Sequence, residues 1–161
     1  FCPRSDGMFN IGSLSYHIGE EDRHHGYYAV GYALGSSPSE TSADKTFNYA
    51  LWTLIEQPLL HVGESHLGAM WQGGTSPASR STCRHYWGAG LIWSNIPPQM
   101  TQVGLVVNRA LYADGRETDV ELTGSFPVCN HFTLQPAVHC INTNGNYTAA
   151  AQLRAILEFG N

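Results

Sequence analysis

Hydrophobic and polar residues alternate along much of the chain, most clearly between residues 117 and 126. In Glu117–Phe126, acids or hydroxyls occupy the odd positions and mostly apolar residues occupy the even ones. Successive side chains of a β-strand point to opposite faces, so this period of two predicts a strand and not a helix, whose period is about 3.6. One face of the predicted strand is acidic and the other is apolar. The apolar face therefore needs a partner, which is either a protein core or lipid.

Turn-forming residues separate segments of roughly ten residues that are rich in Tyr, Trp, Val, Leu and Thr. These segments predict nine strands, at residues 8–18, 26–34, 46–56, 64–72, 85–94, 102–111, 117–126, 132–141 and 148–159. Strands of soluble β-proteins most often have about five or six residues, so this uniform length is unusual. The expected fold is all-β and antiparallel, with strands running up and down in one region, residues 1–161, and no second domain.

The last two predicted strands repeat the design of residues 117–126. One face of the final strand holds mainly Ala and Leu, including Leu153 and Leu157, and the other face holds Gln152, Arg154 and Glu158. The preceding strand alternates in the same way, with Leu134, Val138 and Cys140 opposite Thr133, Gln135 and His139. Three consecutive strands therefore share one arrangement of faces.

The predicted connections differ at the two ends of the sheet. The two longest, 35–45 and 73–84, fall at the same end, where 112–116 and 142–147 are short. The other end carries only modest turns, at 19–25, 57–63, 95–101 and 127–131. Long loops at one end and short turns at the other are typical of transmembrane β-barrels.

Aromatic residues gather toward the ends of the predicted strands. They include Tyr27, Tyr28, Trp52, Trp71, Tyr86, Trp87, Trp93, Tyr112, Phe126, Phe132 and Phe159. In a transmembrane barrel, such rings form girdles at the depth of the lipid headgroups. Packing of the same rings in a soluble β-core is the alternative.

The composition indicates which kinds of binding partner are unexpected. Charged residues make up only 13% of the 161 residues, the net charge is −5, and Lys and Arg are scattered. Nucleic acid is therefore not an expected partner, because binding phosphates requires a basic stripe. No apolar run approaches the roughly 18 residues of a membrane-spanning helix, whereas alternating membrane strands have only weak hydropathy. With neither a signal peptide nor an initiator Met, we expect a removed leader or a start inside a longer protein.

Several side chains suggest chemistry, but their spacing favours structural roles. Asp119 and Glu121 would lie about 6.5 to 7 Å apart on one face, near the separation of an inverting glycosidase pair. They would not flank a bond from opposite sides, and their similar surroundings would not distinguish an acid from a base. The adjacent histidines of 19–26 would point apart, and His61 and His66 have no third ligand at a fixed spacing. We expect no catalytic residue, no metal site, no cofactor and no enzymatic activity.

The four cysteines, Cys2, Cys83, Cys129 and Cys140, form no CxxC motif and no zinc-ligand pairing. Cys129 and Cys140 flank one predicted strand, which would separate them by roughly 36 Å, beyond disulfide reach. The cysteines therefore do not indicate whether the protein belongs to an oxidising or a reducing compartment.

Three motifs near the C-terminus resemble the closing strands of the carbohydrate-selective outer-membrane porins, the OprB family. Glu117–Leu122 is similar to an E-x-x-x-E-L strand, Leu134–His139 to an L-Q-P-x-x-Q/H strand, and Arg154–Phe159 to an R-x-x-x-E/x-F strand. Weaker resemblance extends through Gly88–Leu91, a turn at Pro97 and Pro98, and upstream segments around residues 9–12 and 26–30. The chain departs from the family in that Gly160 and Asn161 follow the terminal aromatic residue.

The resemblance implies a transmembrane β-barrel of about sixteen strands in the bacterial outer membrane, through which sugars such as glucose diffuse passively. Nine strands would be its C-terminal portion. The implied partners are mono- or small oligosaccharides, outer-membrane lipid, and either missing N-terminal strands or other copies of the chain. The candidate pore-lining, sugar-contacting residues are the polar ones predicted to face water: Arg109, Glu117, Asp119, Glu121, Thr123, Gln135, His139, Gln152, Arg154 and Glu158.

Two alternatives stay open at this point. Alternation alone does not separate inside from outside, so a soluble β-barrel or sandwich that binds a small ligand fits the same pattern. The chain could also be a porin fragment without independent activity, because nine strands leave two open edges.

Overall fold

The structure is a computed structural model that describes residues 8–19, 26–37, 46–77, 81–99 and 101–158. These residues form nine β-strands: β1 (Met8–Ile18), β2 (Gly26–Ser37), β3 (Thr46–Val62), β4 (Ser65–Thr75), β5 (Cys83–Ile96), β6 (Thr101–Tyr112), β7 (Arg116–Cys129), β8 (Phe132–Thr143) and β9 (Asn146–Leu157). The described ranges include no helix with the length and hydropathy needed to cross a membrane.

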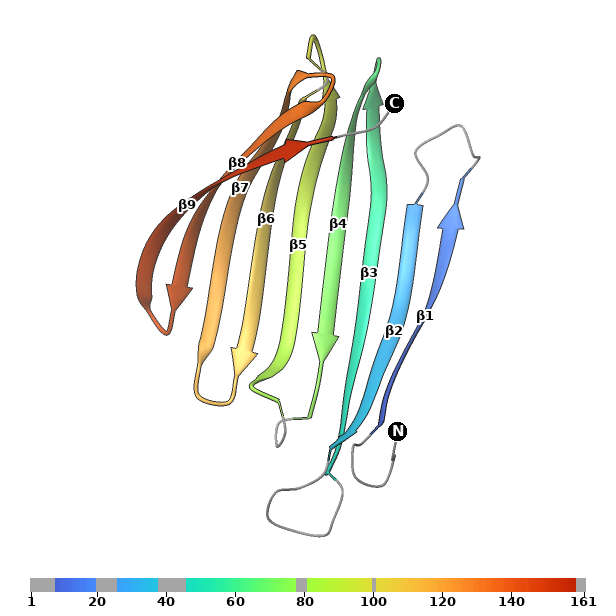
Figure 1. Ribbon diagram of the computed structural model, residues 1–161, viewed down its shortest axis with the longest axis vertical. Helices are drawn as coiled ribbons and strands as arrows, with labels where there is room; N and C mark the ends of the chain where they lie inside the picture. The colour runs from blue at the N-terminus through green and yellow to red at the C-terminus, as the bar shows by residue number, and fades with distance from the viewer. Residues whose placement is uncertain (1–7, 20–25, 38–45, 78–80, 100, 159–161) are drawn as a thin grey trace.

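All nine strands belong to one antiparallel sheet in which each strand pairs with its neighbours in the sequence, β1 through β9 in order. Figure 1 shows this succession from β1 to β9, with a strongly twisted sheet in which β9 sweeps across the view. The sheet is open, with β1 and β9 at its edges. The prediction of an all-β, up-and-down antiparallel fold is therefore confirmed.

Two predicted turns are shorter than expected because strands continue through prolines. We expected turns at 57–63 and 127–131, but β3 runs on to Val62 and β7 to Cys129, which leaves only 63–64 and 130–131. The ladder shifts register between Pro58 and Leu60 and between Pro127 and Cys129. Proline has no N–H to donate to the ladder. At a bulge one residue is left unpaired, so no ladder hydrogen bond is lost and the strand tolerates the proline.

The turns at the opposite end are also tight. Positions 113–115 link β6 to β7, and 144–145 link β8 to β9. Asn144 and Gly145 have φ values of 54° and 96°, a region that Asn and Gly enter most readily. The antiparallel order puts these turns at the same end of the sheet as the last residues of β2 and β4, Ser37 and Thr75. Most of the expected loop 35–45 and most of the charged turn 19–26 lie outside the described residues.

The two faces of the sheet differ in chemistry. We call the face with Glu117, Asp119 and Glu121 the polar face, and the face with Val120, Leu122 and Phe126 the apolar face. Directly paired residues on neighbouring strands share a face, so the register extends both faces from β7 across the sheet. The alternation predicted for the last three strands is confirmed.

Exposure on β7 is the reverse of what a soluble protein shows. Val120, Leu122 and Phe126 are 39%, 54% and 39% exposed, whereas Glu117, Asp119 and Glu121 are half-buried. The same alternation occurs in β5, where Trp87, Leu91 and Trp93 are exposed and Tyr86, Gly88 and Ile92 are not. The polar face is therefore the inner, more enclosed side of the curled sheet, and the apolar face is the outer side.

A hydrophobic core is almost absent from this arrangement. Among the described apolar residues, only Ala29 and Ala137 are buried. The chain exposes 11418 Å², against roughly 7,900 Å² for a compact soluble protein of the same mass. A single sheet has no second layer on which to bury its apolar face, so the large exposed apolar surface follows from the topology. Cys83, Cys129 and Cys140 are unpaired, and Cys2 lies outside the described residues.

Candidate functional site

The polar face collects most of the predicted pore-lining residues. Those on the polar face of β7, β8 and β9 are Glu117, Asp119, Glu121, Thr123, Gln135, His139, Gln152 and Arg154. Glu158 follows the end of β9, where its backbone N–H donates to the carbonyl of His131 at 3.0 Å.

Arg109 does not join this group. It pairs with Thr118 in the β6–β7 register, and Thr118 pairs with Asn142, so Arg109 lies on the apolar face. Its position in the sequence already carried this signal, because Arg109 has the same parity as Val103, Leu105 and Val107. The expectation that Arg109 shares a face with the acids of β7 was therefore wrong.

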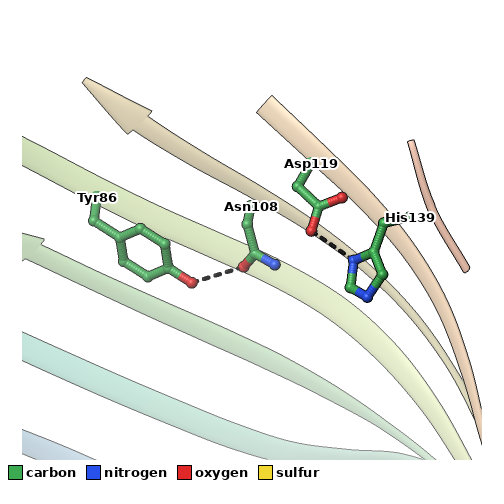
Figure 2. A network of polar contacts seen from close by, with 4 residues as sticks. All are labelled: Tyr86, Asn108, Asp119 and His139. Carbon is green, nitrogen blue, oxygen red and sulfur yellow. Dashed lines mark hydrogen bonds and ion pairs between the residues drawn. The ribbon is translucent and has the colours of Figure 1, made fainter. Parts of the chain in front are cut away.

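A histidine–aspartate contact links β7 and β8 on the polar face. His139 Nδ1 is 3.0 Å from Asp119 Oδ2, and the two side chains are 19% and 20% exposed. Asp119 pairs with Ile141 and Glu121 with His139 in the β7–β8 ladder, which brings all three functional side chains to the same face. Figure 2 shows the contact reaching from one strand to the next.

Three further polar side chains continue this group across β4, β5 and β6. The amide of Gln72 donates to the hydroxyl of Tyr86 at 2.6 Å, and that hydroxyl donates to Asn108 Oδ1 at 2.8 Å. Asn108 is the register partner of Asp119, so the chain of contacts ends beside the His139 pair (Figure 2). We call Gln72, Tyr86, Asn108, Asp119, Glu121 and His139 the polar cluster.

A glycine makes room for the cluster. Gly88 lies between Gln72 and Asn108 in the register, and a Cβ there would collide with Asn108 Oδ1 and meet Gln72 Nε2 at 3.0 Å. Gln72 and Asn108 were not among the residues expected to line a pore, and Tyr86 was expected only in an aromatic girdle. One sequence feature could have indicated this site. Gly88 and Gly90 alternate with apolar residues in β5, and glycine in a strand often marks the face where another group approaches closely.

Two further hydrogen bonds link β7 and β8 beside the polar cluster. The Thr143 hydroxyl donates to Glu117 Oε2 at 3.2 Å, and the Gln135 amide donates to the Ser125 hydroxyl at 3.4 Å. Gln135 also borders a hollow of about 210 Å³ with Gln102, Thr123 and Ser125. The polar face thus offers hydroxyl, amide, carboxylate and imidazole groups along most of β7.

Asp119, Glu121 and His139 each offer a ligand atom, and these atoms lie within 4.8 Å of one another. Asp119 Oδ1 is buried without a hydrogen-bond partner. Opposite ligands of a zinc ion lie at most about 4.4 Å apart, and Asp119 Oδ2 is already in contact with His139. The expectation of no metal site stays a prediction.

His61 and His66 are register partners with ring centroids 6.0 Å apart, without a further metal-ligating group beside them among the described residues.

The apolar face has an organised pattern of rows. Between Thr118 and Phe126 on β7, the outward residues are Val120, Leu122 and Gly124, and their register partners on β6 are Val107, Leu105 and Val103. The eight residue steps from Thr118 to Phe126 span roughly 27 Å along the strand. This length is close to the apolar band of about 25 Å on membrane barrels, whose strands are tilted.

No protein-family model, curated protein or solved structure matches this chain.

Proposed function

We propose that the chain forms part of the wall of a bacterial outer-membrane β-barrel porin, with the apolar face toward lipid and the polar face toward a water-filled lumen. One observation carries the proposal: β7 exposes Val120 and Leu122 while it half-buries Glu117, Asp119 and Glu121. In water this arrangement loses the benefit of burying apolar surface. In a bilayer it satisfies both faces, because lipid covers the apolar side and water fills the lumen.

The extent of the apolar face supports the same conclusion. Each of the nine strands exposes apolar side chains on this face, from Leu14 and Val30 on the first two strands to Leu153 on the last. Exposed patches on soluble monomers rarely exceed a few hundred square ångströms, whereas these side chains are spread over all nine strands of the sheet.

The solute that we propose is a neutral mono- or small oligosaccharide such as glucose. The polar face presents both acceptors and donors, which suit a densely hydroxylated solute: carboxylates on β7, amides at Asn108 and Gln135, and the hydroxyl of Tyr86. Weak contacts spread over many groups allow a solute to enter and also to leave. The resemblance of residues 117–122, 134–139 and 154–159 to carbohydrate-selective porins supplies the solute class.

A complete pore requires partners for both sheet edges. Strands β1 and β9 each have an edge without a neighbouring strand in the described sheet, and unpaired backbone groups in lipid cost several kcal/mol each. We propose that the edges pair with further strands of a larger barrel of about sixteen strands, or with other copies of this chain. Without such pairing, the chain would be a porin fragment with no activity of its own.

Liposome swelling tests the proposal. The detergent-refolded chain is reconstituted into vesicles, and swelling in glucose is compared with swelling in a zwitterionic solute of similar size. Vesicles without protein provide the baseline, and light scattering without detergent is recorded in parallel. Faster swelling in glucose supports a sugar-permeable pore. Detergent dependence without swelling supports a fragment that lacks neighbouring strands. A monodisperse chain without detergent contradicts the membrane placement and favours the soluble ligand-binding alternative.

A further inference from the structure

The apolar face carries a polar band at one end of the sheet. Trp87, Arg109, Thr118, Asn142 and Tyr147 are successive register partners on β5 to β9, so they form one row across five strands. Arg116 lies two residues before Thr118 on the same face, next to the turn at 113–115. The adjacent row toward the middle of the sheet is apolar, with Val107, Val120 and Ala149.

The two arginines border a shared hollow. It has a volume of about 350 Å³ and is lined by Arg109, Arg116, Thr118, Asn142 and Tyr147, with Val120 and Cys140 on its apolar side. This volume is at the lower end of the range of small-ligand pockets, about 300 to 1,000 Å³. The hollow therefore has room for a small polar group and opens onto apolar surface on the side of the neighbouring row.

Neither guanidinium of this hollow forms an ion pair within the described residues, including with Asp114, which is exposed in the turn just before Arg116. The four carboxylates of the described strands, Glu56, Glu117, Asp119 and Glu121, all lie on the polar face. Two cationic groups on an otherwise apolar surface favour an anion from outside the chain.

Hydrogen bonds to the β8–β9 turn hold the backbone of Arg116 in place. The N–H of Arg116 donates to Asn144 Oδ1 at 2.8 Å, and the N–H of Asn144 donates to the carbonyl of Arg116 at 3.1 Å. These two bonds tie the start of β7 to the β8–β9 turn and fix the backbone at Arg116, while Arg109 lies within the β6–β7 ladder. A fixed base reduces the entropy lost when the side chains bind a ligand.

We propose that this hollow binds the phosphate of an anionic lipid headgroup at the edge of the bilayer. Guanidinium groups match the geometry of phosphate oxygens, Trp87 and Tyr147 suit headgroup depth, and the apolar rows beyond Val120 accommodate acyl chains. The inference rests on the proposed membrane placement, but it adds a specific lipid site that a porin wall does not require.

Lipid binding to the refolded chain in detergent micelles tests this inference. Native mass spectrometry measures the binding of phosphatidylglycerol and phosphatidylcholine with identical acyl chains. Arg109→Gln and Arg116→Gln should each weaken phosphatidylglycerol binding about fivefold. Arg154→Gln removes the same charge from the polar face and should leave it unchanged. Phosphatidylcholine binding should be similar in all four proteins.

Equal phosphatidylglycerol binding by wild type and both apolar-face variants would overturn the inference, as would equal losses in all three variants. Displacement of the lipid by millimolar inorganic phosphate would identify a free-anion site and overturn the lipid assignment. Flotation with phosphatidylcholine vesicles separates the two proposals. A chain that floats but has no lipid preference retains the proposed function and loses this site, whereas a chain that does not float contradicts both.

Discussion

His139 Nδ1 lies 3.0 Å from Asp119 Oδ2 across the β7–β8 ladder. The pair lies on the more enclosed face of a sheet whose other face exposes Val120 and Leu122. Polar groups thus meet each other inside the curl of the sheet, and apolar groups face outward. The consequences of this arrangement can be measured separately for stability, insertion and permeation.

The Asp119–His139 contact should contribute to the stability of the refolded protein. A double-mutant cycle with Asp119→Ala and His139→Ala should give a coupling energy of about 1 kcal/mol, because the pair is charge-assisted but partly solvated. Urea unfolding in detergent supplies the free energies. Gln135 and Ser125 also link β7 and β8, at 3.4 Å, and should give a smaller coupling. Equal coupling for the two pairs would contradict a specific role for the histidine contact.

Leu122→Arg should block membrane insertion, whereas Glu121→Gln should leave insertion intact. Leu122 is exposed on the apolar face midway between Thr118 and Phe126, and an arginine near the middle of the lipid-facing side costs about 2 to 4 kcal/mol. Glu121 is its neighbour in the sequence but lies on the polar face. Flotation with vesicles and protease resistance after refolding measure insertion. Normal insertion of Leu122→Arg would show that the apolar face does not meet lipid.

Glu121→Gln should change permeation. The polar face of the described strands carries the carboxylates of Glu56, Glu117, Asp119 and Glu121, against the guanidinium groups of Arg84 and Arg154. Carboxylates outnumber guanidinium groups, so a pore lined by this face should prefer cations. Removing one carboxylate should lower the cation preference, measured as the reversal potential across a planar bilayer under a salt gradient. Glu158→Gln, beyond the end of β9, should have a smaller effect. An unchanged reversal potential for Glu121→Gln would place that carboxylate away from the pore.

Gly88→Ala should destabilise the sheet and separate Tyr86 from Asn108. A methyl group at Gly88 would collide with Asn108 Oδ1 and approach Gln72 Nε2. Both atoms end flexible side chains that can turn away, so the expected cost is the lost Tyr86–Asn108 hydrogen bond, about 1 kcal/mol. Gly68→Ala is the matched control on β4, because its nearest atom would be the Gln57 carbonyl oxygen at 3.7 Å. Urea midpoints in detergent compare the two variants. Equal midpoints would mean that the cluster rearranges freely around residue 88.

Cysteine labelling should report which side each strand position faces. Cys140 is exposed in the apolar row beside Val120, whereas Cys129 is exposed at the end of β7. In single-cysteine variants reconstituted in vesicles, a membrane-impermeant maleimide should label Cys129 and leave Cys140 unlabelled. Both should react after urea extraction. Rapid labelling of Cys140 in intact vesicles would contradict contact with lipid.

The sequence determined the strands and most of the faces, because side-chain alternation is a local property of an extended backbone. All nine strands were predictable from alternation and turn residues, and the separation of Asp119 from Val120 followed from their adjacency in the chain. The turns predicted around Pro58 and Pro127 were too long. Each strand continues past its proline, because a register shift against the neighbouring strand accommodates the proline. Arg109 was expected to face water with the other polar residues, but it has the same parity as Val103, Leu105 and Val107 and lies with them on the apolar face.

Only the tertiary structure decided which distant residues meet. Register brings Gln72, Asn108 and Asp119 onto one row of the sheet, and no spacing within one strand encodes that alignment. The curvature of the sheet also determines that the polar face is the enclosed one. Alternation along a strand separates two faces but does not indicate which of them lies inside. The local pattern is set by each strand alone, whereas row and curvature depend on how all nine strands pair.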